Sequence, residues 1–456
     1  MLGVGALALV IYIVSVICIN TFLKRKISEA IVFSLLILLA YGGIVGRNVW
    51  ELFKDGLLFA LRQDSIFAAL AFIYMAFLMS KTGIIDRLIT ILNSVVGRLR
   101  GGAGYVTTIA SALFGLVSGS GSGNASSVGS ITIPWMQQSG WSDETATVVI
   151  AGNAGLGILF PPSSSMFILL GMPAVAAEVS SGDFYVTMLT VGLIVLLYRL
   201  VLIRCYVGKY GIRAVDSSLI SPIGEAFAAN WTSLLIFLGV AIPLLLTTGP
   251  AAAGLKAAVG FGAKAVKSIS ILIWIPILIT VITAIEGWKY LPHTVSGWLK
   301  MNLDAAPRYA INGILGLAAY TGSRILIKLG LEKEIASTLQ SLGTLSPWIV
   351  VLVVALLINM MVGPFTGSAT TAAVGSLAYV ALRSVNVPPL TACAAILCFI
   401  SNEGCIPPNS SPIYLASGIS GIEDPSVTFK PLLLHYALPT AIIGVLIAMQ
   451  ILPVYQ

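Results

Sequence analysis

Residues 115–165 read GLVSGSGSGNASSVGSITIPWMQQSGWSDETATVVIAGNAGLGILFPPSSS. The stretch is apolar apart from interruptions at 118–124, 139–143 and 161–165, and few of its side chains carry charge. It therefore offers mainly backbone groups and hydroxyls at the points where hydrophobic segments break. Broken helices in membrane proteins are tolerated where they are buried in protein or line a cavity, and there they bind ions and substrates.

Much of this stretch occurs a second time. Residues 121–165 align without a gap on residues 367–411, and 12 of the 45 positions are identical. Eight of these identities are Gly, Ser or Pro, whereas a shared apolar bias would produce matches of Leu, Val and Ala. We interpret the match as an internal repeat rather than a coincidence between two glycine-rich loops.

The composition is that of an integral membrane protein. The chain has 456 residues, of which 57% are hydrophobic and 9% charged, with a mean hydropathy of +0.98. Its apolar runs are about 20 residues long, as membrane helices require, so we predict an all-α membrane protein. The net charge of +7 comes from basic residues in short loops, which indicates membrane topology rather than nucleic-acid binding.

We predict two inverted repeats, residues 1–225 and 226–456. Each contains a re-entrant helical hairpin (105–138 and 347–383) and a broken transmembrane helix (146–170 and 391–413). Five crossings in the first half make the second half inverted, as in elevator-type transporters. The basic residues place 24–26 and 204–213 in the cytoplasm, with both termini outside, and this topology puts a loop at residues 248–267 outside as well. Residues 50–64 and 290–308 are predicted to be interfacial helices.

The breaks are predicted to form two cation sites, one between residues 118–124 and 155–162 and the other between residues 363–371 and 401–408, with the substrate between the hairpin tips. Carbonyl and hydroxyl oxygens suit Na⁺, and half-helix N-termini suit a carboxylate. The predicted cation-binding residues are Ser118, Gly119, Ser120, Gly155, Gly157, Pro161, Gly363, Gly367, Ser368, Ser401, Asn402, Glu403, Gly404 and Pro407. The predicted substrate-binding residues between the tips are Ser122, Asn124, Ser163, Ser165, Thr370 and Asn409. The alternative is that these small residues only allow close helix packing.

Two carboxylates need separate interpretation. Glu403 lies inside a predicted span, where a charge costs at least ~2.5 kcal/mol, so it either balances a cation, carries a proton or makes a helix–helix contact. Glu286 lies at a span end near Lys289, and we predict an interfacial ion pair there. No cluster of His, Asp and Glu or nucleophile–base pair stands out, so we predict that the chain is not an enzyme and needs no cofactor other than Na⁺.

At these breaks the chain resembles the large (M or DctM-type) permease subunit of tripartite ATP-independent periplasmic (TRAP) transporters. The similar motifs are SGS at 118–120, GILFPPS at 157–163, NEG at 402–404, PP at 407–408 and ASGI at 416–419. The resemblance implies a Na⁺-coupled elevator importer of an organic acid in the inner membrane of a prokaryote. It also implies a small four-helix membrane subunit and a periplasmic or lipid-anchored substrate-binding protein as partners, besides membrane lipids.

Two motifs depart from that family. Many members carry TPTEA after the sixth span, where this chain has TTGPA at 247–251. Many also carry Asp in a Phe-x-Asp pattern in the second hairpin, where this chain has FTG at 365–367. Two other functions stay open: a stand-alone carrier that works without a binding protein, and an ion channel, which needs a continuous pore.

Overall fold

The protein is helical throughout its described part. The computed structural model describes residues 3–25, 27–62, 64–119, 121–214, 220–247, 249–258, 271–331, 334, 346–363, 366–407 and 410–455. All regular elements in these residues are helices, which confirms the predicted all-α class. Among them, residues 143–170, 181–210, 223–247 and 425–448 form helical stretches long and apolar enough to cross a membrane. The membrane orientation stays a prediction.

The first half runs from α1 to α12. Its helices are α1 (Val4–Thr21), α2 (Ile27–Ile44), α3 (Val49–Leu61), α4 (Asp64–Lys81), α5 (Ile84–Val96), α6 (Gly102–Ser118), α7 (Gly121–Gln138), α8 (Asp143–Ala154), α9 (Leu156–Leu159), α10 (Ser164–Leu170), α11 (Pro173–Ala176) and α12 (Ser181–Tyr210). Side-chain caps fix several of these starts: Asn48, Ser142 and Ser163 each accept a hydrogen bond from the backbone N–H three residues later.

The second half runs from α13 to α25. Its helices are α13 (Ile223–Asn230), η2 (Trp231–Phe237), α14 (Leu238–Thr247), α15 (Gly249–Ala257), α17 (Ile271–Glu286), η3 (Trp288–Tyr290), α18 (Val295–Lys328), α20 (Pro347–Val362), α21 (Gly367–Ser384), α22 (Pro389–Ile400), η4 (Ser401–Gly404), α23 (Ser411–Ser420), η5 (Pro425–Thr428), α24 (Phe429–Leu432), η6 (Leu433–Ala437) and α25 (Leu438–Ala448). The bounds of α21 and α22 follow those of α7 and α8 by 246 residues at both ends (367 − 121 and 400 − 154).

The structure differs from the sequence expectations in three places. The hairpin breaks are shorter than predicted, because α7 already begins at Gly121 and α21 at Gly367. The predicted interfacial segment 290–308 is not a separate helix, since most of it continues into the next span as α18, with Pro307 inside the helix. Part of the predicted loop 248–267 is helical, as α15, and residues 259–267 lie outside the described residues.

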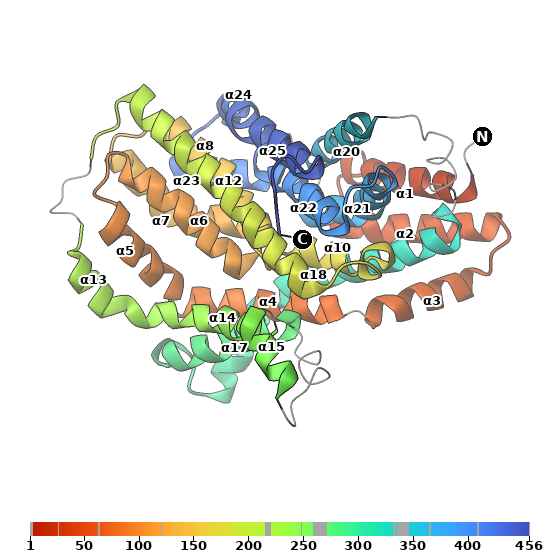
Figure 1. Cartoon of the computed structure of the whole chain (residues 1–456), viewed down its shortest axis with the longest axis horizontal. Coiled ribbons are helices and arrows are strands. Elements are labelled where there is room, and N and C mark those ends of the chain that lie inside the picture. Colours follow the sequence, from red (N-terminus) through yellow and green to blue (C-terminus); the bar gives the residue numbers. More distant parts are fainter. Residues whose placement is uncertain are drawn as a thin grey trace.

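The broken helix of the first half lies at the centre of the molecule. The apolar window of residues 143–170 is entirely buried inside the protein. Helix α23 of the second half packs against α7 and α8, while α10 of the first half packs against α21. Figure 1 shows the result, with the blue C-terminal helices set between the orange hairpin and the red N-terminal helices. The breaks of both halves are thereby brought into one region.

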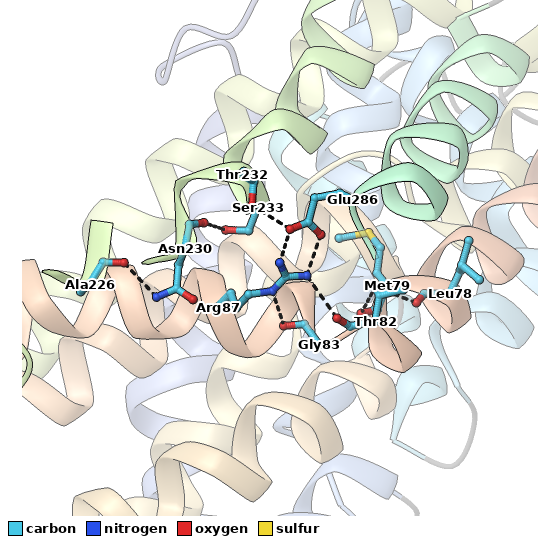
Figure 2. Close-up of polar contacts among 10 residues, drawn as sticks. All are labelled: Leu78, Met79, Thr82, Gly83, Arg87, Ala226, Asn230, Thr232, Ser233 and Glu286. Carbon is cyan, nitrogen blue, oxygen red and sulfur yellow. Dashed lines mark hydrogen bonds and ion pairs between the residues drawn. The ribbon is translucent and has the colours of Figure 1, made fainter. Parts of the chain in front are cut away.

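At the periphery of this core, an ion pair joins α5 to α17 (Figure 2). Arg87 on α5 forms a two-armed contact with Glu286 at the end of α17, with 2.6 Å between Nη2 and Oε2. Thr232 donates to the same carboxylate at 2.7 Å, and Arg87 donates to the Thr82 carbonyl at 3.1 Å. The pair expected at Glu286 is therefore present, but its partner is Arg87 from the first half rather than the neighbouring Lys289.

A second polar contact lies outside the predicted spans. Glu178, just after α11, accepts hydrogen bonds from the Tyr379 hydroxyl at 2.7 Å and from Arg383 Nε at 2.8 Å, both on α21. The hydrogen bond from Tyr379, followed by the contact with Arg383, lowers the pKa of Glu178 below its usual range. This contact ties the outer end of the second hairpin to the loop that follows the first broken helix.

Candidate functional site

The hairpin tips rest directly on the Pro-Pro breaks. Gly119 has the left-handed backbone φ of +57°, and a Cβ there would lie 2.5 Å from the Pro162 carbonyl oxygen. In the other half, a Cβ at Gly363 would lie 2.6 Å from the Pro407 carbonyl oxygen and 2.9 Å from Ile406 Cγ2. No side chain fits either position, because glycine alone allows such an approach of backbone to backbone. Each tip therefore contacts the break of its own half, as the sequence predicted.

The two breaks also contact each other. A Cβ at Gly155, where α8 ends, would overlap the carbonyl oxygen of Ser401 in η4. A Cβ at Gly404 would likewise overlap the carbonyl oxygen of Ala151. The two cation sites predicted as separate places are thus adjacent, with only backbone between them.

Glu403 lies beside the first residues of α7 and α21, the helices that form the second arm of each hairpin. Gly121 is the first residue of α7 and Gly367 the first residue of α21. The Gly367 N–H donates a hydrogen bond to one carboxylate oxygen of Glu403, and the Gly121 backbone lies against the other. Helix N-termini carry a partial positive charge, so both helices present it to the same carboxylate. Glu403 is 9% exposed, which explains why it is paired with helix ends rather than with water.

One turn beyond these glycines lie two polar side chains in equivalent positions. Asn124 on α7 and Thr370 on α21 are 1% and 0% exposed. Asn124 donates through Nδ2 to the Ser111 carbonyl at 2.8 Å, yet its Oδ1 has no hydrogen-bond partner, and neither has Thr370 Oγ1. The adjacent Thr371 differs, since its hydroxyl donates to the Gly367 carbonyl at 2.7 Å. Buried polar atoms are rarely left unpaired, so these two oxygens point to a ligand.

Other predicted side chains are already engaged in local structure. Ser163 Oγ accepts from the Met166 N–H at 3.2 Å as the cap of α10, and Ser401 Oγ donates to the Cys398 carbonyl at 2.7 Å. Asn402 donates to Asn359 Oδ1 at 2.7 Å and keeps its own Oδ1 unpartnered. The remaining predicted residues in the described part lie in the two breaks or in the first turns of the helices that follow a break or a hairpin tip: Gly157, Pro161, Ser165, Ser122 and Ser368. Ser120 and Asn409 lie outside the described residues, as does the side chain of Ser118.

Sequence reasoning missed a buried arginine behind the second break. Arg199 on α12 is 1% exposed; it donates to Thr440 Oγ1 at 2.8 Å, and its guanidinium lies 4.3 Å from the centre of the Tyr436 ring. Tyr436 belongs to the π-helical turn η6, and π-helical turns occur frequently at functional sites. The available signal was an arginine inside the apolar run 184–202.

The chemistry of the site is that of oxygen ligands. Among the described residues, no group of three or more His, Cys, Asp or Glu side chains is arranged to hold a metal ion. The unpartnered amide and hydroxyl oxygens beside one carboxylate are hard donors, which fit an alkali cation such as Na⁺ better than a transition metal.

Comparison with known proteins places these features in a family. Residues 5–453 match the family described as "Tripartite ATP-independent periplasmic transporter, DctM component". The sialic acid TRAP transporter permease SiaT of Haemophilus influenzae is 28% identical over 204 residues, 44% of this chain and 33% of that protein. The C4-dicarboxylate large permease DctM of Pseudomonas aeruginosa is 32% identical over 159 residues, 35% of this chain and 36% of that protein. The matched segments thus span about a third of the length of these relatives.

Solved structures show the same fold. The YdaH transporter of Alcanivorax borkumensis superposes with a TM-score of 0.67 at 16% identity, over 93% of this chain and 98% of that chain. MtrF of Neisseria gonorrhoeae gives a TM-score of 0.62 at 13% identity, over 88% and 84%. At these identities the likeness concerns the fold alone. Because the family match covers nearly the whole sequence, this chain belongs to the DctM component family of the tripartite ATP-independent periplasmic transporters.

Proposed function

We propose that this chain is the large permease subunit of a TRAP transporter and imports a small organic acid together with Na⁺. It would work with a small four-helix membrane subunit and a substrate-binding protein outside the membrane. The observation that carries the proposal is the pair of buried, unpartnered oxygens, Asn124 Oδ1 and Thr370 Oγ1, one turn from the glycines that contact Glu403.

Family membership confirms the broader predictions. The chain is a multi-pass protein of the inner membrane and a transport protein, not an enzyme. The inverted repeat and the elevator motion belong to the proposal, supported by the 246-residue offset between the bounds of α7 and α21. An inverted repeat would make the two tips approach the site from opposite sides of the membrane.

The charges of the site support Na⁺ as the coupling ion. A buried carboxylate in a membrane is costly unless it is compensated, and Glu403 has two helix N-termini near it. Each N-terminus is equivalent to about half a positive charge, so the two together can offset the carboxylate, and a bound Na⁺ would then give the site a net positive charge that favours a carboxylate substrate. The amide oxygen of Asn124 and the hydroxyl of Thr370 would be ligands for this ion.

The substrate class follows from the relatives. Their names record sialic acid, C4-dicarboxylate and, for the TeaC permease of Halomonas elongata, ectoine. All three compounds carry a carboxylate, so we propose a carboxylate substrate between the hairpin tips. Since Glu403 already lies at the starts of α7 and α21, the N-terminus of α10, capped by Ser163, is the better position for the substrate anion.

Reconstitution tests the proposal. The chain is placed in liposomes with and without the candidate small subunit and binding protein, and uptake of radiolabelled N-acetylneuraminate, ectoine and succinate is measured under a Na⁺ gradient. Uptake of one compound that requires Na⁺ and both partners is expected. Uptake without the partners would instead identify a stand-alone carrier, and uptake driven by a pH gradient alone would replace Na⁺ by a proton.

A pair of neighbouring variants tests the ligand assignment. Thr370→Val removes the unpartnered hydroxyl, whereas Thr371→Val removes one that serves its own helix. We expect Thr370→Val to raise the Na⁺ concentration for half-maximal uptake about tenfold, the effect of losing roughly 1.4 kcal/mol. Thr371→Val should leave it unchanged. Equal behaviour of the two variants would refute a Na⁺ ligand at position 370.

A further inference from the structure

A large basic cavity lies at the N-terminal end of α6 and the C-terminal end of α12, in a part of the molecule that the transport site does not use. The cavity has a volume of about 1020 Å³, and Arg100, Arg204 and Arg213 line it. No acidic residue is among its described lining residues, and none of the three arginines forms an ion pair within the described ranges. It therefore gathers three exposed positive charges that the described protein leaves uncompensated.

The backbone around the cavity is held in place and leaves room for a ligand. The Gly101 N–H donates to the Arg213 carbonyl at 3.3 Å, which joins the start of the first hairpin to the chain after α12. Arg204 folds back over its own helix, since a Cβ at Gly208 would lie 3.7 Å from its Nη1. At Gly211 a Cβ would meet nothing within 4 Å. The wall of the cavity at Gly211 thus borders open space.

An apolar stripe on α12 leads into the cavity. Leu193, Leu197 and Val201 are spaced by four residues and are 53%, 63% and 62% exposed. Arg204 and Gly208 continue the same exposed face of the helix. Figure 1 shows α12 as one long helix, which packs against α6, with its C-terminal end on the same side of the molecule as the α5–α6 connection. In a membrane, the stripe would face acyl chains and the arginines would face headgroups.

We propose that this cavity binds the headgroup of an anionic phospholipid, whose acyl chains lie along the α12 stripe. A guanidinium forms paired hydrogen bonds with phosphate oxygens, and three of them favour a headgroup with net negative charge over a zwitterionic one. Basic pockets between membrane helices bind such headgroups. Free phosphate could bind the same arginines, but it has no apolar part to contact the α12 stripe. The bound lipid would connect the N-terminal end of α6 to the C-terminal end of α12.

Native mass spectrometry of the full chain in detergent tests the proposal. Phosphatidylglycerol and phosphatidylcholine are titrated separately, and inorganic phosphate is added as a competitor. The Arg204→Gln/Arg213→Gln variant removes two lining charges. Its control, Arg98→Gln/Lys209→Gln, removes two exposed charges that do not line the cavity, one from the α5–α6 connection and one from α12.

The wild type should bind phosphatidylglycerol saturably and in preference to phosphatidylcholine. The lining variant should bind it about 25-fold more weakly, roughly fivefold for each arginine, and the control should bind as the wild type does. Thermal unfolding without added lipid should be the same for all three proteins, because the side chains are exposed. Equal binding of the two lipids, equal losses in both variants, or displacement by an equal concentration of inorganic phosphate would each overturn the proposal.

Discussion

The smallest possible side chain at the start of α7 should impair transport. In Gly121→Ala, the new Cβ would overlap Glu403 Oε1 and would also lie 3.4 Å from the Ala154 carbonyl oxygen. Neither neighbour can move freely, because the carboxylate is held by the Gly367 N–H on its other side. We therefore expect the Glu403 side chain to leave its position between the two helix starts.

The expected loss of uptake follows from two free energies, that of the lost hydrogen bond and that gained when alanine replaces glycine in a helix. Displacing the carboxylate removes at least one hydrogen bond to a charged group, a loss of about 1.5–3 kcal/mol. Replacing glycine by alanine in a helix returns about 0.5–1 kcal/mol. The arrangement of Glu403 should thus be destabilised by about 1–2 kcal/mol, which corresponds to a 5–30-fold loss of uptake if that arrangement is required.

Gly129→Ala, further along the same helix, is the matched control. Its Cβ would meet Ile150 Cγ2 at 3.3 Å and Ile419 Cδ1 at 3.5 Å, so only a small shift of flexible side chains is needed. Both variants are compared in Na⁺-driven uptake by proteoliposomes, with thermal unfolding in detergent as the measure of folding. Unchanged uptake by Gly121→Ala, or an equal loss in Gly129→Ala, would show that the start of α7 is not part of the site.

Three further outcomes are expected. Arg87→Met should lower the free energy of unfolding by about 3–5 kcal/mol because it leaves the buried Glu286 carboxylate with Thr232 as a hydrogen-bond donor but without its positive partner, and adding Glu286→Leu should recover much of the loss. A thermal-unfolding shift near zero for the single variant would contradict this. Glu178→Gln should lower the free energy of unfolding by less than about 1 kcal/mol at neutral pH. Because the pKa of Glu178 is lowered in the folded protein, its contribution to stability is present above its ordinary pKa of 4.5 and is lost as the pH falls through the folded value. The unfolding free energies of wild type and variant should therefore converge in acid. Gly367→Asp should abolish uptake, and the added change Glu403→Ala should restore part of it; no recovery would argue against interchangeable charges at the two positions.

Helix breakers made the central features predictable. Gly119, Gly363 and the two Pro-Pro pairs act through their own backbone, so their effect can be read from the sequence without knowing any distant neighbour. The structure places the described members of this set, Gly119, Gly363, Pro161, Pro162 and Pro407, at the tips and breaks that the pattern indicated. The 290–308 segment shows the opposite case: it contains Pro307, which would be expected to end or bend a helix, yet α18 continues through it.

Partners distant in the sequence were not predictable. Nothing in the local sequence of Glu403 indicates that it meets Gly121 and Gly367, and nothing near Arg199 indicates Tyr436. Such pairs depend on how the two halves of the chain pack together, and local sequence patterns do not specify that packing. The same holds for Arg87, whose carboxylate partner lies in the other half of the chain.

Gly367, which lies against Glu403, stands at one of the two departures from the family pattern. Many relatives place Asp at the third position of Phe-x-Asp, and this chain has Gly367 there. A Cβ at Gly367 would lie 2.9 Å from Glu403 Oε2, so an aspartate would set a second carboxylate against the first. Two buried carboxylates in contact cannot both stay ionised. In this chain, glycine at 367 leaves room for the Glu403 carboxylate, which supplies the negative charge of the site. The loss of the hairpin aspartate is then no argument against a coupled cation, since Glu403 keeps one carboxylate at the start of α21.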